Sequence, residues 1–194
     1  MPDKMTPEQR HRCMSRIRGK NTRPEILVRK GLHARGFRFR LHDRKLPGSP
    51  DLVLPKWGVA ILVNGCFWHG HKGCRYATRP KSNEEFWSAK IARNIHRDEV
   101  TAAHLEGRGW QVITIWECEL KSASTREARL DALAEEIRQA GELLRQRKEE
   151  RRRITALTRA ERAQMRERQA RLMEEVEAFF LQIPKDLTNF REQN

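Results

Sequence analysis

The chain has 194 residues and a formal net charge of +14, from 40 Lys and Arg residues against 26 Asp and Glu residues. Its 34% charged and 38% hydrophobic residues suit one domain with an appendage outside the core. The longest apolar run, residues 59–63, is far shorter than the roughly 18 residues of a membrane span, and the N-terminus lacks a secretory apolar region. We therefore expect a soluble, cytoplasmic protein with no membrane partner.

The positive charge is concentrated near the N-terminus. Residues 1–45 have a charge balance of +10, from 14 basic and 4 acidic residues, whereas residues 140–194 contribute only +3. This distribution is typical of a surface that binds a polyanion, although a basic surface can also serve solubility alone. We call residues 1–20 the basic arm, and its candidate DNA-binding residues are Arg16, Arg18 and Lys20.

Two helices are predicted before the first strand. Thr6 and Pro7 have the character of a helix start that runs to Gly19, and Thr22 with Glu25 has the spacing of a capping box. The second helix is expected to end near Gly36.

Four strands and further helices follow. Strands are predicted at residues 37–41, 51–54, 59–63 and 110–116. A helix is predicted from Asn83 to about residue 108, and another opens at Thr125. On the first of these two helices, the residues expected to contact the core are Phe86, Ile91, Ile95 and Leu105. The order predicts a mixed sheet flanked by helices, an α/β or α+β core, and we take the α/β fold as the expectation.

Residues 141–194 are predicted to form a helical extension. Glu, Arg, Gln, Ala and Leu dominate residues 142–175, which contain no Gly or Pro. A second capping box at Thr158–Glu161 predicts a helix start within it. An apolar stripe follows at helical spacing, formed by Leu172, Val176, Phe179 and Phe180. The stripe would pack on the core or on a protein partner.

The most specific chemical pattern is a Cys/His cluster. Cys66, His71 and Cys74 have metal-ligand spacing in a Gly-containing loop, and Cys118 follows a predicted strand. Zn²⁺ favours four N and S ligands in a tetrahedron, and a site filled by four protein ligands is structural. The alternative is buried cysteines beside a surface histidine. Cys13 stands apart in the sequence and is expected to be a packing residue.

Asp51 is the first catalytic candidate. It follows the turn at residues 47–50 and begins a short strand. Carboxylates at strand ends hold Mg²⁺ in many nucleases, but Asp after a Pro-containing turn is also common.

Four segments together resemble the very-short-patch repair (Vsr-type) DNA mismatch endonucleases, over roughly residues 5–140. They are residues 47–51 (PGSPD), 64–71 (NGCFWHGH), 85–87 (EFW) and 116–118 (WEC). The resemblance implies a restriction-endonuclease-like fold and a structural zinc on the same four ligands. It also implies Mg²⁺-dependent nicking of duplex DNA on the 5′ side of the thymine in a T·G mismatch.

The resemblance further implies roles for individual residues. Asp51 is the principal Mg²⁺ carboxylate, with the backbone carbonyl of Val63 as a further ligand. His69 is the acid/base candidate, Glu25 reaches into the active site, and Asp98 matches an acidic position that orients a histidine or a metal-bound water. Phe67, Trp68 and Trp87 match an aromatic wedge that unstacks bases.

Several of these residues also have a purely structural interpretation. Glu25 can simply complete the capping box, Asp98 can form a surface ion pair with Arg97 or Lys90, and Trp87 can be a core residue.

Asn64 departs from the resemblance, because the family usually has histidine at this position. Asparagine can donate a hydrogen bond to a phosphate but does not titrate near neutral pH. Three hypotheses remain open: a mismatch-nicking endonuclease, a related nuclease with another DNA target in a defence or restriction context, and a DNA-binding homologue impaired by Asn64.

Overall fold

The computed structural model describes residues 6, 8, 9, 12, 15, 19–78, 80 and 83–181, without the side chains of Phe180 and Leu181. Only isolated positions of the predicted first helix are described. Its residues Cys13, Arg16 and Arg18 lie outside the described residues. The chain divides into two compact units, Met1–Leu144 and Arg145–Asn194. Each unit is considered by itself below.

The first described helix, α2 (Arg23–Ala34), begins at the predicted capping box. The Thr22 hydroxyl accepts from the backbone N–H of Glu25, and the Glu25 carboxylate accepts from the backbone N–H of Thr22. The reciprocal bonds satisfy two backbone donors that a helix start otherwise leaves free. Val28 and Leu32 bury the apolar face of α2 in the core.

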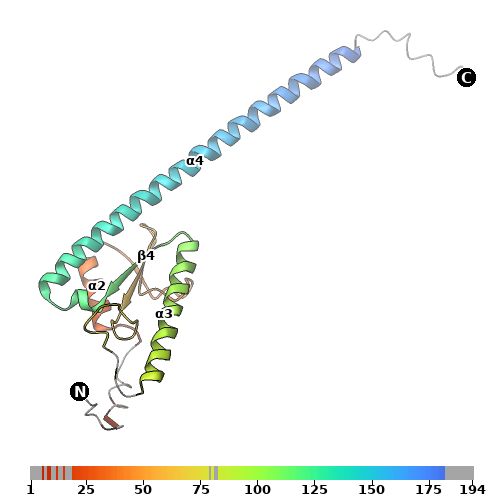
Figure 1. The fold of residues 1–194 in the computed structure, drawn as a ribbon. Coiled ribbons are helices and arrows are strands. Elements are labelled where there is room, and N and C mark those ends of the chain that lie inside the picture. The colour runs from red at the N-terminus through yellow and green to blue at the C-terminus, as the bar shows by residue number, and fades with distance from the viewer. Residues whose placement is uncertain are drawn as a thin grey trace, which may run out of the picture. The chain divides into compact units, whose positions relative to one another are not determined.

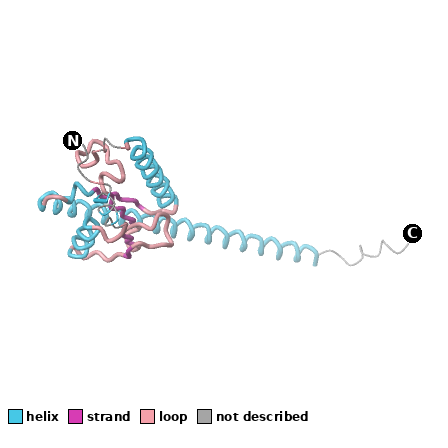
Figure 2. The backbone as a smooth tube through the Cα atoms, turned by 90° about the horizontal axis from the view of Figure 1, so that it is seen from below, coloured by secondary structure: helices cyan, strands magenta, loops and turns pink. Residues whose placement is uncertain are grey.

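A four-stranded mixed sheet forms the centre of the first unit, in the order β1 (Arg40–Leu41), β2 (Leu52–Leu54), β3 (Val59–Asn64) and β4 (Gln111–Trp116). The first three strands are antiparallel neighbours, and β4 pairs with β3 in parallel, with Val63 opposite Ile115. Figure 2 shows the strands at the centre with helices around them. The predicted strand at residues 37–41 is shorter than expected, because only its last two residues pair with β2.

Helix α3 (Glu84–Gly107) makes the crossover between the parallel strands β3 and β4. Ile91 and Leu105 are buried as predicted, but Ile95 is only half-buried. The expectation for Phe86 was wrong, since its side chain is 53% exposed. Asn83 occupies the N-cap position in a left-handed conformation, and its side chain forms no capping hydrogen bond.

After the short 3₁₀ helix η1 (Glu117–Leu120), the chain continues as one helix, α4 (Ala123–Leu181), of 59 residues (Figure 1). Its first part buries Leu130, Leu133 and Ile137 in the core.

The expectation of a second helix start at Thr158 was wrong. The Thr158 hydroxyl donates to the carbonyl of Ile154, one turn earlier, so α4 continues through the proposed box. Leu172, Val176 and Phe179 are exposed, and none of the helices in the described residues is long and apolar enough to cross a membrane.

Candidate active site and metal centre

Asp51 lies immediately before β2, at the end of the turn that the sequence predicts. Its Oδ2 accepts a 2.8 Å hydrogen bond from the backbone N–H of Val63, in the neighbouring strand β3. Burial raises the pKa of the Asp51 carboxyl, the Val63 hydrogen bond opposes this shift, and the charge of Glu25 adds to it. Asp51 is therefore a fixed carboxylate in a site where negative charge is poorly solvated.

Glu25 lies close to Asp51 but is already heavily bonded. Its carboxylate accepts from the backbone N–H groups of Asn21 and Thr22, and Arg29 pairs with it at 2.5 Å. Both interpretations of Glu25 are therefore combined: it completes the capping box, and it also faces the group around Asp51. With both oxygens occupied, Glu25 is poorly suited to bind a metal directly.

His42 lies between these two carboxylates, and no pattern in the sequence predicted its position there. Its Nε2 lies 3.5 Å from a Glu25 oxygen and 2.9 Å from an Arg29 nitrogen, and its Nδ1 lies 3.8 Å from Asp51 Oδ1. Because arginine only donates hydrogen bonds, Nε2 is the acceptor, and the proton of a neutral ring is on Nδ1, toward Asp51. His42 also has a φ of 46°, in the region that non-glycine residues rarely adopt.

A divalent cation fits this group of residues. Ligand atoms of Glu25, His42 and Asp51 lie within 4.8 Å of one another. Mg²⁺ prefers oxygen ligands and keeps several waters, so one available carboxylate and a main-chain oxygen can hold it. The pKa of Asp51 is raised first by burial and then by the charge of Glu25, and a bound cation would oppose both effects.

Asn64 ends β3 opposite Trp116 and is only 8% exposed. Asn64 is therefore next to the Val63 peptide that anchors Asp51.

His69 and Asp98 form a second polar pair. The turn after β3 carries His69, and its Nδ1 contacts a carboxylate oxygen of Asp98 on α3. Asp98 also lies 3.4 Å from Arg97, so the ion-pair interpretation holds in part as well. Since Asp98 occupies Nδ1, the Nε2 atom of His69 remains to exchange a proton. No hydrogen bond or ion pair joins this pair to Asp51 in the described part of the chain.

The structure brings the four predicted zinc ligands together. The ligand atoms of Cys66, His71, Cys74 and Cys118 lie within 4.8 Å of one another. His71 Nδ1 is 3.5 Å from Cys66 Sγ and 3.4 Å from Cys118 Sγ. Zn–N and Zn–S bonds of ordinary length in a tetrahedron put N and S about 3.6 Å apart. Two of the six ligand–ligand distances therefore match those of a tetrahedral zinc site.

The environment of the thiols also favours a cation. Burial and the neighbouring Cys66 and Cys74 raise the pKa of Cys118 to about 12. Burial raises the pKa of Cys66 as well, whereas a backbone hydrogen bond at Tyr76 lowers that of Cys74. Three thiolates cannot stay ionised together without a positive partner. His71 stacks on Trp116, with ring centroids 4.1 Å apart, so its ring orientation is fixed.

The three predicted wedge residues form one aromatic cluster, which we define as Phe67, Trp68 and Trp87. Their ring centroids are 5.1–5.9 Å apart, and all three side chains are half-buried. Phe86 extends the cluster, and Lys90 lies 5.4 Å from the Trp68 ring. Lys90 thus contacts aromatic rings and does not pair with Asp98. Lys20, the described member of the basic arm candidates, is exposed.

Comparison with known proteins supports the resemblance. The family model of the DNA mismatch endonuclease Vsr matches residues 2–75. The chain is 49% identical to the type II nicking enzyme V.XorIIP of Xanthomonas oryzae, covering 95% of that protein and 67% of this chain. It is 35% identical to the DNA mismatch endonuclease Vsr of Escherichia coli, covering 89% of that protein and 71% of this chain. The chain belongs to the Vsr family. It is a DNA endonuclease that hydrolyses phosphodiester bonds.

The family membership leaves a large part of the chain unexplained. A further relative, the type II nicking enzyme V.NmeAIP of Neisseria meningitidis, is 44% identical and is covered over 99% of its length. That match covers 72% of this chain, so a substantial segment has no counterpart in the relative.

Proposed function

We propose that this Vsr-family enzyme is an Mg²⁺-dependent endonuclease that nicks one strand of duplex DNA on the 5′ side of the thymine in a T·G mismatch. The observation that carries the proposal is Asp51, a desolvated carboxylate fixed by the Val63 N–H beside β3. Similarity to a protein named as a DNA mismatch endonuclease supports the choice of substrate.

In this proposal Asp51 and the Val63 carbonyl hold the Mg²⁺ ion, which would polarise the scissile phosphate when bound. His42 contacts Arg29 and Glu25, and its Nδ1 lies 3.8 Å from Asp51, so we assign it a supporting position beside the carboxylate that Val63 fixes. Hydrolysis joins a water oxygen to phosphorus and breaks one phosphodiester P–O bond. His69 Nε2 would take a proton from the attacking water or give one to the leaving oxygen, and Asp98 fixes the orientation of the ring through Nδ1.

Mismatch recognition is assigned to the aromatic cluster. Inserting an apolar side chain into a base step costs a few kcal/mol, and the cost is smallest where pairing is already disturbed. Phe67 and Trp68 lie in the same turn as His69, so insertion at the mismatch would bring the proton-transfer residue to the adjacent backbone. Trp87 supports them from α3.

The Cys/His cluster and the basic arm are assigned supporting roles, in folding and in DNA binding. We propose that residues 21–140 are the endonuclease core, with Cys66, His71, Cys74 and Cys118 binding a structural zinc. The basic arm, residues 1–20 with Arg16, Arg18 and Lys20, would contact DNA phosphates.

A nicking assay tests the proposal directly. Duplexes that differ only in a T·G or a T·A pair are incubated with Mg²⁺ and with either the wild type or Asp51→Asn. We expect cleavage of one strand of the T·G duplex by the wild type only. Equal cleavage of both duplexes, or cleavage that does not require Asp51, contradicts the proposal.

A second candidate function is nicking at a different DNA target. The relatives with 49% and 44% identity carry the name type II nicking enzyme, which specifies no mismatch. The same residues would cut, but the aromatic cluster would recognise another structure. Cleavage of a matched or methylated duplex at least as fast as the T·G duplex would favour this function.

The impaired homologue is tested by Asn64→His. A buried asparagine beside Val63 can hold the strand end but cannot supply a proton. A large gain in nicking rate on this substitution would favour impairment, and efficient nicking by the wild type would exclude it.

A further inference from the structure

The strongest unassigned charge lies in α4, in the segment 145–162 of the second unit. This segment contains eight basic and three acidic residues, a balance of +5. Its residues belong to one uninterrupted helix, so its side chains have defined directions. The remainder of the helix, residues 163–181, has three basic and four acidic residues. The excess of positive charge is therefore confined to the first half of the unit's helix.

Most of these cations share one side of the helix. At about 100° per residue, Lys148, Arg151, Arg152, Arg159 and Arg162 fall within roughly half of the circumference. We call these five residues the arginine face. Two of the three acidic residues, Glu150 and Glu161, fall on the opposite half.

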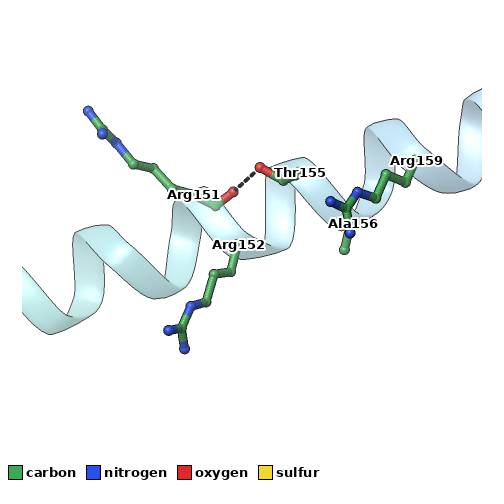
Figure 3. A pocket seen from close by; sticks show the side chains of 5 residues that line it. All are labelled: Arg151, Arg152, Thr155, Ala156 and Arg159. Carbon is green, nitrogen blue, oxygen red and sulfur yellow. Dashed lines mark hydrogen bonds between the residues drawn. The ribbon is translucent and has the colours of Figure 1, made fainter.

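The centre of the arginine face is open. The small residues Thr155 and Ala156 lie there, and an open hollow is lined by them with Arg151, Arg152 and Arg159 (Figure 3). The Thr155 hydroxyl donates to the carbonyl of Arg151 and so stays against the helix. Figure 3 shows Arg151 and Arg152 leaving the helix in different directions, so the arginines present separate donors along the helix, as an extended anion with several phosphates requires.

The three arginines that line this hollow form no ion pair within the described residues. In the described ranges of the chain, no carboxylate lies within 4.0 Å of Arg151, Arg152 or Arg159. Earlier in the same helix, Arg129 pairs with Glu119 at 3.0 Å and with Glu136 at 2.8 Å. Like charges at i and i+4, such as Lys148 and Arg152, destabilise a helix slightly. The arginine face is thus an arrangement that an external anion would stabilise.

We propose that the arginine face binds the phosphate backbone of the duplex that the enzyme cleaves. From Lys148 to Arg162 the helix extends about 22 Å, which is long enough to meet several phosphates. Planar guanidinium groups match phosphate oxygens in a bidentate way. Ile154 and Leu157, the large apolar residues of the segment, point away from this face, so it lacks the apolar anchors of a protein interface.

The proposal rests on the family's action on DNA and is independent of mismatch choice. Phosphate contacts carry no sequence information, so a matched and a T·G duplex gain equally from them. Failure of the T·G specificity would leave the arginine face untouched, and failure of the arginine face would leave the nicking chemistry untouched.

The test uses the full chain and duplex DNA without divalent ions. Arg151→Gln, Arg152→Gln and Arg159→Gln are combined in one variant. The matched control combines Arg166→Gln, Arg168→Gln and Arg171→Gln, which remove the same charge from the same helix. Affinity is measured at several salt concentrations, on matched and T·G duplexes, and helix content is followed by circular dichroism.

Each lost phosphate contact reduces the slope of log affinity against log salt by about 0.9. We expect the arginine-face variant to lower the slope by about 2 to 3 on both duplexes, and the control variant to lower it by less than 1. Replacing the same three arginines by lysine, which keeps charge and helix propensity, is expected to keep the wild-type slope.

Three results would overturn the proposal. The first is an unchanged salt slope in the glutamine variant. The second is a control variant whose salt slope falls as much as that of the arginine-face variant, which would indicate an effect of overall charge only. The third is a change of oligomeric state with an unchanged slope, which would assign the face to a protein partner. If the glutamine variant loses helix content, the decision falls to the lysine variant, and a slope as low as that of the glutamine variant would overturn the proposal too.

Discussion

The two candidate metal sites of this enzyme differ in both chemistry and completeness. The Cys/His cluster offers four protein ligand atoms, three of them sulfur, within 4.8 Å of one another. The group around Asp51 has oxygen and nitrogen atoms, and most of them are already bonded to one another. A closed, sulfur-rich site suits a structural ion, whereas an open, oxygen-containing site suits an ion that must also contact substrate. The donor set therefore distinguishes an ion that supports the fold from one that takes part in the reaction.

The largest expected effect is loss of the Cys/His cluster. Structural zinc contributes on the order of 10 kcal/mol to folding in small zinc domains. We expect Cys118→Ser to lose bound zinc, to lower the melting temperature by well over 10 °C and to remove nicking. Zinc content and thermal unfolding measure this, with Cys13→Ser as the control that keeps the metal. If the variant keeps its stability and activity without zinc, the Cys/His cluster does not hold a structural ion, and the distinction between the two sites fails.

The raised pKa values of Cys66 and Cys118 give this prediction a pH dependence. At neutral pH these thiols are protonated without metal, so zinc binding releases their protons. Zinc affinity should fall at least tenfold per pH unit on acidification, measured by competition with a chelator. A pH-independent affinity would contradict the assignment.

The second effect is on the group around Asp51, which we call the open site. Removing the metal carboxylate gives up several kcal/mol of transition-state stabilisation, so Asp51→Asn should reduce nicking by at least about 1,000-fold. Zinc content and folding should be unchanged. Asp43→Asn, a nearby carboxylate in the loop before β2, is the matched control and should remain active. A residual rate within tenfold of the wild type would remove Asp51 from the reaction.

The third effect concerns proton transfer. General acid–base catalysis is worth about 100- to 10,000-fold, so His69→Gln should fall in that range. Asp98→Asn acts through His69 and should cost less, about tenfold, with a shift of the pH profile that a purely structural role would not produce. His96→Gln on the exposed side of α3 is the control. An unchanged pH profile in Asp98→Asn would mean that Asp98 does not act on proton transfer through His69 and only forms an ion pair.

The smallest effect is on stability at the open site. The pKa of Asp51 is raised above its ordinary 3.8, so its ionised form costs stability at neutral pH and that cost disappears as pH falls below 3.8. Without metal, Asp51→Asn should therefore be slightly more stable than the wild type at pH 7, and the difference should shrink toward pH 4. Urea unfolding at both pH values measures it. A less stable variant at pH 7 would mean that Asp51 is not under electrostatic strain.

Local signals predicted much of the fold. The capping box at Thr22 and the apolar strand at residues 59–63 appear as expected, because each depends on neighbouring residues only. The prediction failed at Thr158, where the same local signal is overruled by a helix that continues on both sides. Phe86 was wrongly assigned to the core, since helical periodicity does not show which face a neighbouring turn will cover.

The candidate site was predictable where ligands share a loop. Cys66, His71 and Cys74 are close in sequence, and the sequence alone suggested that Cys118 joins them. His42 and Arg29 were missed, because they reach Asp51 only through the packing of α2 and the loop after β1. A histidine directly after a short strand carries no spacing signal, and its left-handed conformation is visible only in the structure.

The position of Cys118 has a consequence for how the enzyme is made. Cys118 lies in η1, directly after β4, and β4 is the parallel partner of β3. During synthesis, the last sulfur ligand of the cluster becomes available only when Cys118 has been added. The strand that pairs with β3 beside Val63 is completed just before it. A truncated product ending earlier would therefore lack the metal cluster and a partner for the strand that anchors Asp51. The Cys/His cluster and the parallel partner of β3 can therefore form only after nearly all of the first unit has been translated.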